Sequence, residues 1–289
     1  MSFSTQLAVD AVAIQARLDA AMAGFSNEPM VEAMRYAAQG GKRLRGFLVL
    51  EAARMLGIPA ARAISAAAAV EALHAYSLVH DDMPCMDNDA LRRGLPTVHV
   101  KWDEATAVLA GDALQTLAFE LMADPAIGAA ETRIALVAGL AQASGAEGMV
   151  LGQALDIAAE TAAQPLNLEQ ITELQAGKTG ALIRFSAEAG AILAGADPAP
   201  LRAYATALGL AFQIWDDVLD ETGDAALTGK AVGKDAAAGK ATFVSLLGLD
   251  AARSRATSLV EQAENALAPY GPLAQNLIDC ARFVIARQS

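Results

Sequence analysis

Apolar residues recur at helical spacing along most of this chain, and that spacing constrains the fold more than any other feature. Within residues 4–23 the spaced apolar positions are Leu7, Val12, Ile14, Leu18 and Met22. Such spacing puts most of them on one face of an amphipathic helix. No stretch of the sequence alternates apolar and polar residues as a half-buried strand does. The sequence therefore predicts an all-α fold.

Glycines and capping residues divide this pattern into successive helices. Ser4 or Thr5 is expected to begin the first helix. Asp103, Asp124 and Asn167 are start signals for later helices, because such side chains accept hydrogen bonds from the first free N–H groups of a helix. The predicted helices are 4–23, a second ending near 39, 43–57, 60–83, 103–122, 126–146, 148–160, 168–176, 178–195, 198–220, 241–249, 251–268 and 272–287.

The stretch from His80 to Pro96, HDDMPCMDNDALRRGLP, gathers acids and arginines. It contains four acids, which are Asp81, Asp82, Asp87 and Asp89. Two arginines, Arg92 and Arg93, follow them. Carboxylates this dense repel one another unless a cation neutralises them, and the usual neutraliser is a hard divalent cation held by oxygens. An arginine pair suits phosphate oxygens. The stretch predicts a phosphate bridged to the chain through magnesium; the alternative is a solvated acidic loop.

Pro84 lies inside this stretch and cannot occupy a helix interior without losing a hydrogen bond. The preceding helix is therefore predicted to break near Met83. Asp81 and Asp87 are six residues apart and would diverge on an unbroken helix. The break is expected to bring Asp87 back towards Asp81.

A second acidic stretch, FQIWDDVLD, occupies residues 212–220. Asp216 and Asp220 are spaced i, i+4 and share one helical face, which Gln213 and Asp217 extend. A helix that is otherwise apolar must point such a polar stripe at water, a partner or a ligand. We expect the two acidic stretches to hold one metal–diphosphate cluster from opposite sides.

Basic residues gather at three other places. GGKRLRG at 40–46 puts Lys42, Arg43 and Arg45 where a helix begins, and helix N-termini favour anions. GKTG at 177–180 puts a lysine and a hydroxyl at another helix junction, and the glycine-rich stretch 223–242 carries further lysines. Each is a candidate phosphate site, although a basic turn in water looks the same in sequence.

Composition and cysteine usage exclude several classes of protein. The net charge of −12 argues against nucleic acid or an anionic membrane as a partner. Two cysteines, Cys85 and Cys280, without a CxxC pair, argue against structural zinc and a disulfide framework. We expect no signal peptide and no membrane span, and predict a cytoplasmic protein. With 289 residues, 54% hydrophobic and no linker-like segment, a single domain over 1–289 is expected.

Taken together, the motifs resemble those of the short-chain prenyl diphosphate synthases, and most closely those of bacterial farnesyl diphosphate synthases. The matching stretches are GGKRLR at 40–45, DDMPCMD at 81–87, LRRG at 91–94, GMVLGQALD at 148–156, GKTGAL at 177–182 and DDVLD at 216–220. They run in family order from about residue 30 to the end. The first acidic motif carries the same two-residue insertion, around Pro84-Cys85.

The resemblance implies a helical bundle around a deep central cavity, usually in a homodimer. It implies that isopentenyl diphosphate condenses head-to-tail with dimethylallyl and then geranyl diphosphate to give farnesyl diphosphate. It also implies three magnesium ions, for which manganese substitutes, on the allylic diphosphate. Isopentenyl diphosphate needs no metal in this scheme.

Roles for individual residues also come from the resemblance. Metal binding falls to Asp81, Asp82, Asp87, Asp216, Asp217 and Asp220. The allylic diphosphate is expected on Arg92, Lys178, Lys230 and Lys240, and the isopentenyl diphosphate on Lys42, Arg45, His74 and Arg93. Lys178, Thr179 and Gln213 are the catalytic candidates, the last two beside the reacting carbons. The alternative interpretation is that His74 is a core residue without a role in substrate binding.

Tyr76 and Ser77 are the fifth and fourth residues before the first motif, the positions that limit chain length in the resembling family. We expect Tyr76 to form the floor of the pocket that holds the growing prenyl chain. The alternative is that Tyr76 only packs between helices. Three residues depart from the family pattern: Gly46 replaces a usual proline, Ala90 a common acid and Leu95 a common lysine. None is expected to touch a residue with an assigned role.

Three other functions compete with a farnesyl diphosphate synthase. A synthase of geranyl or geranylgeranyl diphosphate would carry the same motifs. A terpene cyclase shares the acid-rich helices but needs no isopentenyl site, so GGKRLR with His74 argues against it. A non-catalytic subunit would be expected to lose one acidic motif, and both are complete here.

Overall fold

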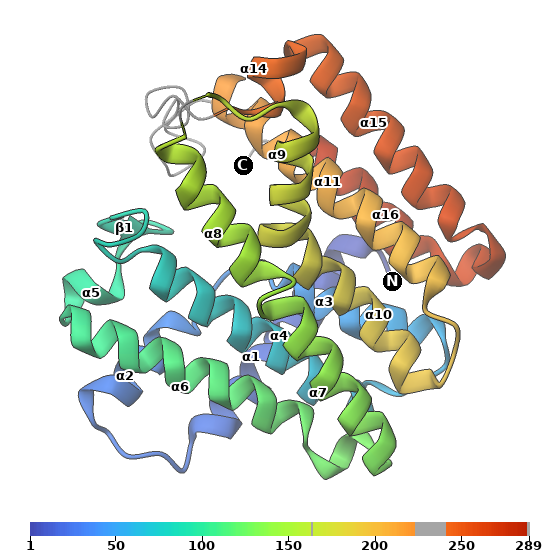
Figure 1. Cartoon of the computed structure of the whole chain (residues 1–289). Helices are drawn as coiled ribbons and strands as arrows, with labels where there is room; N and C mark the ends of the chain where they lie inside the picture. The colour runs from blue at the N-terminus through green and yellow to red at the C-terminus, as the bar shows by residue number, and fades with distance from the viewer. Residues whose placement is uncertain (163, 223–240, 288–289) are drawn as a thin grey trace. The chain divides into compact units, whose positions relative to one another are not determined.

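The computed structural model describes residues 1–162, 164–222 and 241–287, and they are almost wholly helical (Figure 1). The all-α prediction is confirmed. The chain divides into two compact units, residues 1–140 with 189–196 and residues 141–188 with 197–289. A single domain over 1–289 stays a prediction.

The first unit, in chain order, contains α1 (Phe3–Met22), α2 (Pro29–Ala37), α3 (Leu44–Met55), α4 (Ala60–Asp81), β1 (Leu91–Arg92), β2 (Leu95–Pro96), α5 (Val98–Lys101), α6 (Glu104–Met122), the 3-10 helix η1 (Pro125–Ile127) and most of α7 (Ala130–Ser144). The second unit contains α8 (Met149–Glu160), α9 (Leu168–Gln175), the π-helix η2 (Ala176–Gly180), most of α10 (Ala181–Ala194), α11 (Ala199–Thr222), α14 (Phe243–Leu247), α15 (Leu249–Ala266), the 3-10 helix η3 (Ala268–Ala274) and α16 (Gln275–Ala286).

Helix α4 is the central helix of the first unit and packs against α1, α3 and α6. Its fully buried run from Ala66 to Ala69 explains how neighbours approach it on several sides, because small side chains let helix backbones come close. The end of α4 carries His74, Tyr76, Ser77 and Asp81. The core of this unit thus holds the first acidic stretch in place.

In the second unit, α11 packs against α15, α16 and η2, and α8 packs against η2. Gly152 of α8 lies so near η2 that an added Cβ would be 2.0 Å from the backbone nitrogen of Lys178. A side chain larger than that of glycine would therefore clash with η2 at this position. The contact brings Lys178 beside α8.

Several element boundaries differ from the sequence prediction. Helix α1 begins at Phe3, capped by the hydroxyl of Ser2 rather than by Ser4 or Thr5. Asp124 caps the short η1, not the long helix expected from 126, because α7 starts only at Ala130. Asp103 and Asn167 cap α6 and α9 as predicted.

A two-stranded hairpin, β1 with β2, escaped the sequence prediction. Its turn residues, Arg93 and Gly94, have φ angles of 53° and 76°, the positive values that two-residue hairpin turns require. Strands of two residues are too short to show an alternating pattern. Leu95 pairs with Arg92 across this ladder. The expectation that Leu95 touches no residue with an assigned role was therefore wrong.

Residues 130–160 have the length and mean hydropathy of a membrane-spanning helix, by length and composition only. The stretch is two helices, α7 and α8, with a break at 145–148 that contains Glu147. The absence of a membrane span stays a prediction.

Candidate active site

The first acidic stretch folds back on itself, as Pro84 predicted. Helix α4 ends at Asp81, and the backbone N–H of Asp87 donates to the carbonyl oxygen of Asp81 at 2.8 Å. The N–H of Asp89 likewise donates to the carbonyl of Asp82 at 3.2 Å. The bend therefore brings the backbone at Asp87 next to the end of α4.

Arg92 is held against this bend. Its Nε donates to Oδ1 of Asp82 at 2.7 Å, and its Nη2 lies 3.6 Å from Oδ2 of Asp89. Burial raises the pKa of Asp82, and the hydrogen bonds and charge of Arg92 oppose that rise. Asp82 and Arg92, predicted to contact metal and diphosphate respectively, thus contact each other here. Arg93 follows Arg92 in the hairpin turn but has a different partner. Its guanidinium donates a hydrogen bond to the carbonyl of Gln39 at 3.1 Å.

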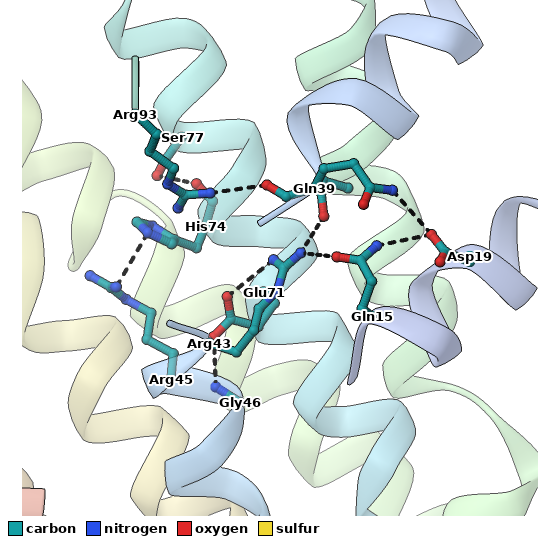
Figure 2. A network of polar contacts seen from close by, with 11 residues as sticks. Gln15, Asp19, Gln39, Arg43, Arg45, Gly46, Glu71, His74, Ser77 and Arg93 are labelled. Carbon is teal, nitrogen blue, oxygen red and sulfur yellow. Dashed lines mark hydrogen bonds and ion pairs between the residues drawn. The ribbon is translucent and has the colours of Figure 1, made fainter. Parts of the chain in front are cut away.

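The basic cluster forms around the start of α3 (Figure 2). Nη1 of Arg45 lies 3.3 Å from Nε2 of His74, and Lys42 is exposed. Arg43 behaves differently, because its side chain turns inward and is only 4% exposed. Of the three cations expected to cluster at GGKRLRG, Lys42 and Arg45 are therefore accessible to solvent, whereas Arg43 is buried. The structure brings Arg45, His74 and Arg93 together in one unit.

Burial and four surrounding arginines, Arg45 first, lower the pKa of His74 well below its usual value. Neutral His74 accepts a hydrogen bond from Arg45 at Nε2 if its own proton is on Nδ1. A positively charged imidazole beside these guanidinium groups would be repelled. These surroundings favour the neutral form of His74 within the cationic cluster.

The lowered pKa predicts an acid-side loss of stability. Below its usual pKa of 6.5 the histidine takes up a proton in the unfolded chain before the folded one, so the free energy of unfolding falls as pH falls. Between pH 7 and 5.5 we expect a decrease of up to about 1 kcal/mol from this residue. Urea unfolding of His74→Gln should show a flatter pH dependence than the parent. His99→Gln, in α5, is the matched control, and an equal flattening there would contradict the assignment.

The second acidic stretch lies on α11, the predicted helix, with Asp216, Asp217 and Asp220 all partly exposed. Oδ1 of Asp216 accepts a hydrogen bond from Arg287 at 2.5 Å. Oδ2 of Asp217 accepts one from the N–H of Phe243 at 2.7 Å, at the start of α14. Asp217, predicted to support a metal, is therefore also a helix-capping group.

Arg287 is a residue that sequence reasoning missed. Its guanidinium lies 3.9 Å from the ring centre of Phe212, and its carbonyl accepts a hydrogen bond from the indole of Trp215 at 3.2 Å. The side chain is only 10% exposed. No local sequence signal points to it, because its partner Asp216 lies 71 positions earlier.

The predicted catalytic residues of the second unit lie on η2 and α11. Nζ of Lys178 lies 2.6 Å from Oδ2 of Asp156 on α8, and Thr179 follows it in the π-helix. The amide nitrogen of Gln213 donates to Oε1 of Gln175 at 2.6 Å. Sequence reasoning gave Asp156 no role, although Asp156 and Gln153 are the two polar residues of the otherwise apolar stretch 149–159.

Lys230 and Lys240, both predicted to hold the allylic diphosphate, lie outside the described residues. The structure brings the first acidic stretch together with Arg92 in one unit, and Lys178 together with Asp156 in the other. The meeting of the two acidic stretches around one diphosphate stays a prediction.

Comparison with known proteins identifies the family of this chain. The polyprenyl synthetase family matches residues 27–268. A farnesyl diphosphate synthase of Escherichia coli is 50% identical over 252 residues, covering 84% of this chain and 83% of that protein. One of Haemophilus influenzae is 43% identical and covers 99% of both chains. The solved apo structure of an FPP/GFPP synthase from Zymomonas mobilis has a TM-score of 0.89 at 45% identity, covering 98% of each chain.

This chain belongs to the polyprenyl synthetase family.

Polyprenyl synthetases depend on magnesium, and the acids of this chain suit that ion. Among residues 1–162, 164–222 and 241–287 no three potential ligands of the His, Cys, Asp and Glu types converge into a metal cage. Magnesium usually takes one or two carboxylates together with phosphate oxygens of a substrate. Carboxylate oxygens on either side of the bend at Asp81 and Asp87 are that kind of donor.

The two residues predicted to limit chain length lie on α4 one turn before the acidic bend. The hydroxyl of Ser77 donates to the carbonyl of His74 at 2.9 Å. The ring of Tyr76 meets the ring of His80 edge to face, with centres 5.1 Å apart. Burial, followed by the charges of Asp81 and Asp112, raises the pKa of the Tyr76 phenol. Tyr76 is thus a neutral, partly buried ring near the family's first acidic motif.

Proposed function

We propose that this chain condenses isopentenyl diphosphate with dimethylallyl diphosphate and then with geranyl diphosphate, giving (2E,6E)-farnesyl diphosphate. The observation that carries the proposal is the presence of two kinds of site, one acidic and one cationic. A bent acidic segment lies beside Arg92, and a cationic cluster forms around Arg45 and His74. Two relatives, 50% and 43% identical to this chain, are farnesyl diphosphate synthases.

The reaction separates charge and recombines it. The bond between the allylic C1 and its diphosphate oxygen breaks, and the electron pair leaves with the diphosphate. The double bond of isopentenyl diphosphate attacks the allylic cation, and the departing diphosphate accepts the proton that is then lost. Bound magnesium, three ions per site by the resemblance and replaceable by manganese, would neutralise the leaving charge.

In this scheme the chain's own residues bind and orient the two substrates. Arg92 and Lys178 would hold the allylic diphosphate, and Asp156 aims the lysine. Thr179 and Gln213 would place oxygens near the allylic cation, with Gln175 orienting the amide of Gln213. Lys230 and Lys240 complete the proposed phosphate contacts.

Two single substitutions test whether there are separate diphosphate sites. Arg45→Ala should raise the KM for isopentenyl diphosphate about tenfold or more, and the KM for geranyl diphosphate much less, because its contact belongs to one substrate. Lys178→Ala should do the reverse or lower kcat. Steady-state kinetics with each substrate varied in turn give both constants. Equal changes for both substrates in both variants would contradict two separate sites.

Chain length distinguishes the proposed product from its nearest alternatives. The Zymomonas mobilis relative, an FPP/GFPP synthase at 45% identity, favours a longer product as the second candidate. Incubation with labelled isopentenyl diphosphate and each allylic primer, followed by product sizing, decides the matter. A fifteen-carbon product supports the proposal, and ten-, twenty- or twenty-five-carbon products identify another synthase. Cyclised products or no incorporation would indicate a cyclase or a non-catalytic subunit.

We also propose a homodimer in the cytoplasm. Leu109 on α6 and Ile134 on α7 are 55% and 68% exposed within the first unit, and a second copy of the chain would cover such apolar side chains. Light scattering after gel filtration should give about twice the chain mass of 29.7 kDa. Neither Cys85 nor Cys280 forms a disulfide, in keeping with a reducing compartment. A mass of one chain at micromolar concentration would exclude the dimer.

A further inference from the structure

Glu71 is a buried acid at the edge of the cationic cluster, one helical turn before His74 on α4 (Figure 2). Both of its carboxylate oxygens have partners in the segment that begins α3. Oε1 accepts the backbone N–H of Gly46 at 2.8 Å, and Oε2 lies 3.5 Å from Nη1 of Arg43. Glu71 and Arg43 are each 4% exposed at the side chain, so this ion pair is shielded from water. Glu71 therefore contacts Arg43, two positions before Arg45, and Gly46, directly after it.

Arg43 adopts a backbone conformation that needs support. Its φ angle is 53°, in the left-handed region, and it is the residue that precedes α3. Residues other than glycine rarely adopt that region, and surrounding contacts must hold them there. The guanidinium of Arg43 supplies those contacts, donating to Oε1 of Gln15 at 2.5 Å and to the carbonyl of Ala38. Glu71 provides the negative charge that makes a buried guanidinium tolerable.

Gly46 supplies the other contact, at a position where a Cβ would crowd its neighbours. A Cβ there would lie 2.6 Å from Cδ1 of Ile14 and 3.1 Å from the carbonyl oxygen of Ala67. The proline usual at this position in the resembling family has no N–H to donate. In this chain the departure from proline gives Glu71 a backbone hydrogen bond that the family's usual residue cannot make.

We propose that Glu71 is a positioning residue for the isopentenyl diphosphate site. By holding Arg43 on one side and Gly46 on the other, it fixes the turn from which Arg45 reaches His74. Glu71 touches no substrate and acts through the turn. The inference rests on the proposed function for the identity of the ligand, and on the contacts of Glu71 for the positioning role.

Substrate-specific kinetics test the role. Glu71→Gln keeps the size of the side chain and an oxygen for Gly46, but it loses the charge opposite Arg43. We expect the KM for isopentenyl diphosphate to rise about tenfold, with kcat and the KM for geranyl diphosphate within about twofold of the parent. Glu51→Gln is the matched control, because Glu51 is a buried acid on α3 that pairs with Arg54 outside the cluster. A lower melting temperature with an unchanged KM would overturn the proposal.

If Glu71→Gln does not fold, the double variant Arg43→Met with Glu71→Gln removes both buried charges at once. It avoids an unpaired buried cation yet still loses the ionic part of the clamp. The same selective rise in the KM for isopentenyl diphosphate is expected. Parental kinetics in this folded double variant would overturn the proposal.

A spectroscopic measurement separates the positioning role from the proposed reaction. The chain has three histidines, so nitrogen-15 spectra of histidine-labelled protein without substrate are simple to assign. In Glu71→Gln the ring-nitrogen resonances of His74 should move, because the contact with Arg45 changes, while those of His80 and His99 stay. Unmoved His74 resonances would overturn the positioning role. Moved resonances in a chain whose parent fails to consume isopentenyl diphosphate would support positioning and contradict the proposed function.

Discussion

Asp81→Asn should lower kcat about a thousandfold, because the variant loses one of the charges that we propose to hold metal against the leaving diphosphate. The fold should survive, since Asp81 lies at the end of α4 beside other carboxylates, and removing one negative charge relieves their repulsion. The measurement is steady-state turnover at saturating magnesium, together with urea unfolding. Glu120→Gln, an exposed charge change on α6 outside the proposed machinery, should leave both unchanged.

Removal of the metal checks the same assignment without mutation. Excess chelator should abolish turnover of the parent, and added magnesium should restore it. The Asp81→Asn variant should need more magnesium for half-maximal activity than the parent does. Full turnover in chelator, or a near-normal rate in Asp81→Asn, would show that the acidic bend does not hold the metal.

Tyr76→Ala should change the product from fifteen carbons to twenty or more, and Ser77→Phe should shorten it mainly to ten. Tyr76 lies about 7.5 Å along the helix axis from Asp81, at roughly 1.5 Å per residue. A ring at that depth can block a growing chain, whereas the small Ser77 leaves room for geranyl diphosphate to bind as the second primer. Chromatographic sizing of labelled products measures both effects.

The contact of Tyr76 with His80 provides the competing interpretation, in which the ring only packs between helices. Tyr76→Phe is the matched control for Tyr76→Ala, because it keeps the ring and loses the hydroxyl. That variant should still give fifteen carbons. An unchanged product from both Tyr76→Ala and Ser77→Phe would remove these two residues from the control of chain length.

Local chemistry decided the features that sequence reasoning predicted well. Helical spacing predicted an all-α chain, because that pattern is a property of neighbouring residues. Pro84 predicted the end of α4 and the return of Asp87, because a proline ring cannot continue a helix whatever surrounds it. The shared face of Asp216 and Asp220 followed in the same way from the pitch of α11.

Contacts between distant residues were beyond such reasoning. The sequence predicted one basic cluster of Lys42, Arg43 and Arg45. In the structure, Arg43 instead points inward to Glu71, which lies 28 positions later in the sequence. Sequence spacing alone does not reveal which side chain of a run points inward.

By itself, therefore, the sequence determined the helices of this protein, the bend in its first acidic motif and its family. The tertiary structure decided which charges meet: Asp82 with Arg92, Lys178 with Asp156 and Asp216 with Arg287. The physical reason is that helix formation and proline breaks depend on residues a few positions apart. An ion pair depends instead on which helix faces pack together, and that is settled only when the core of each unit forms.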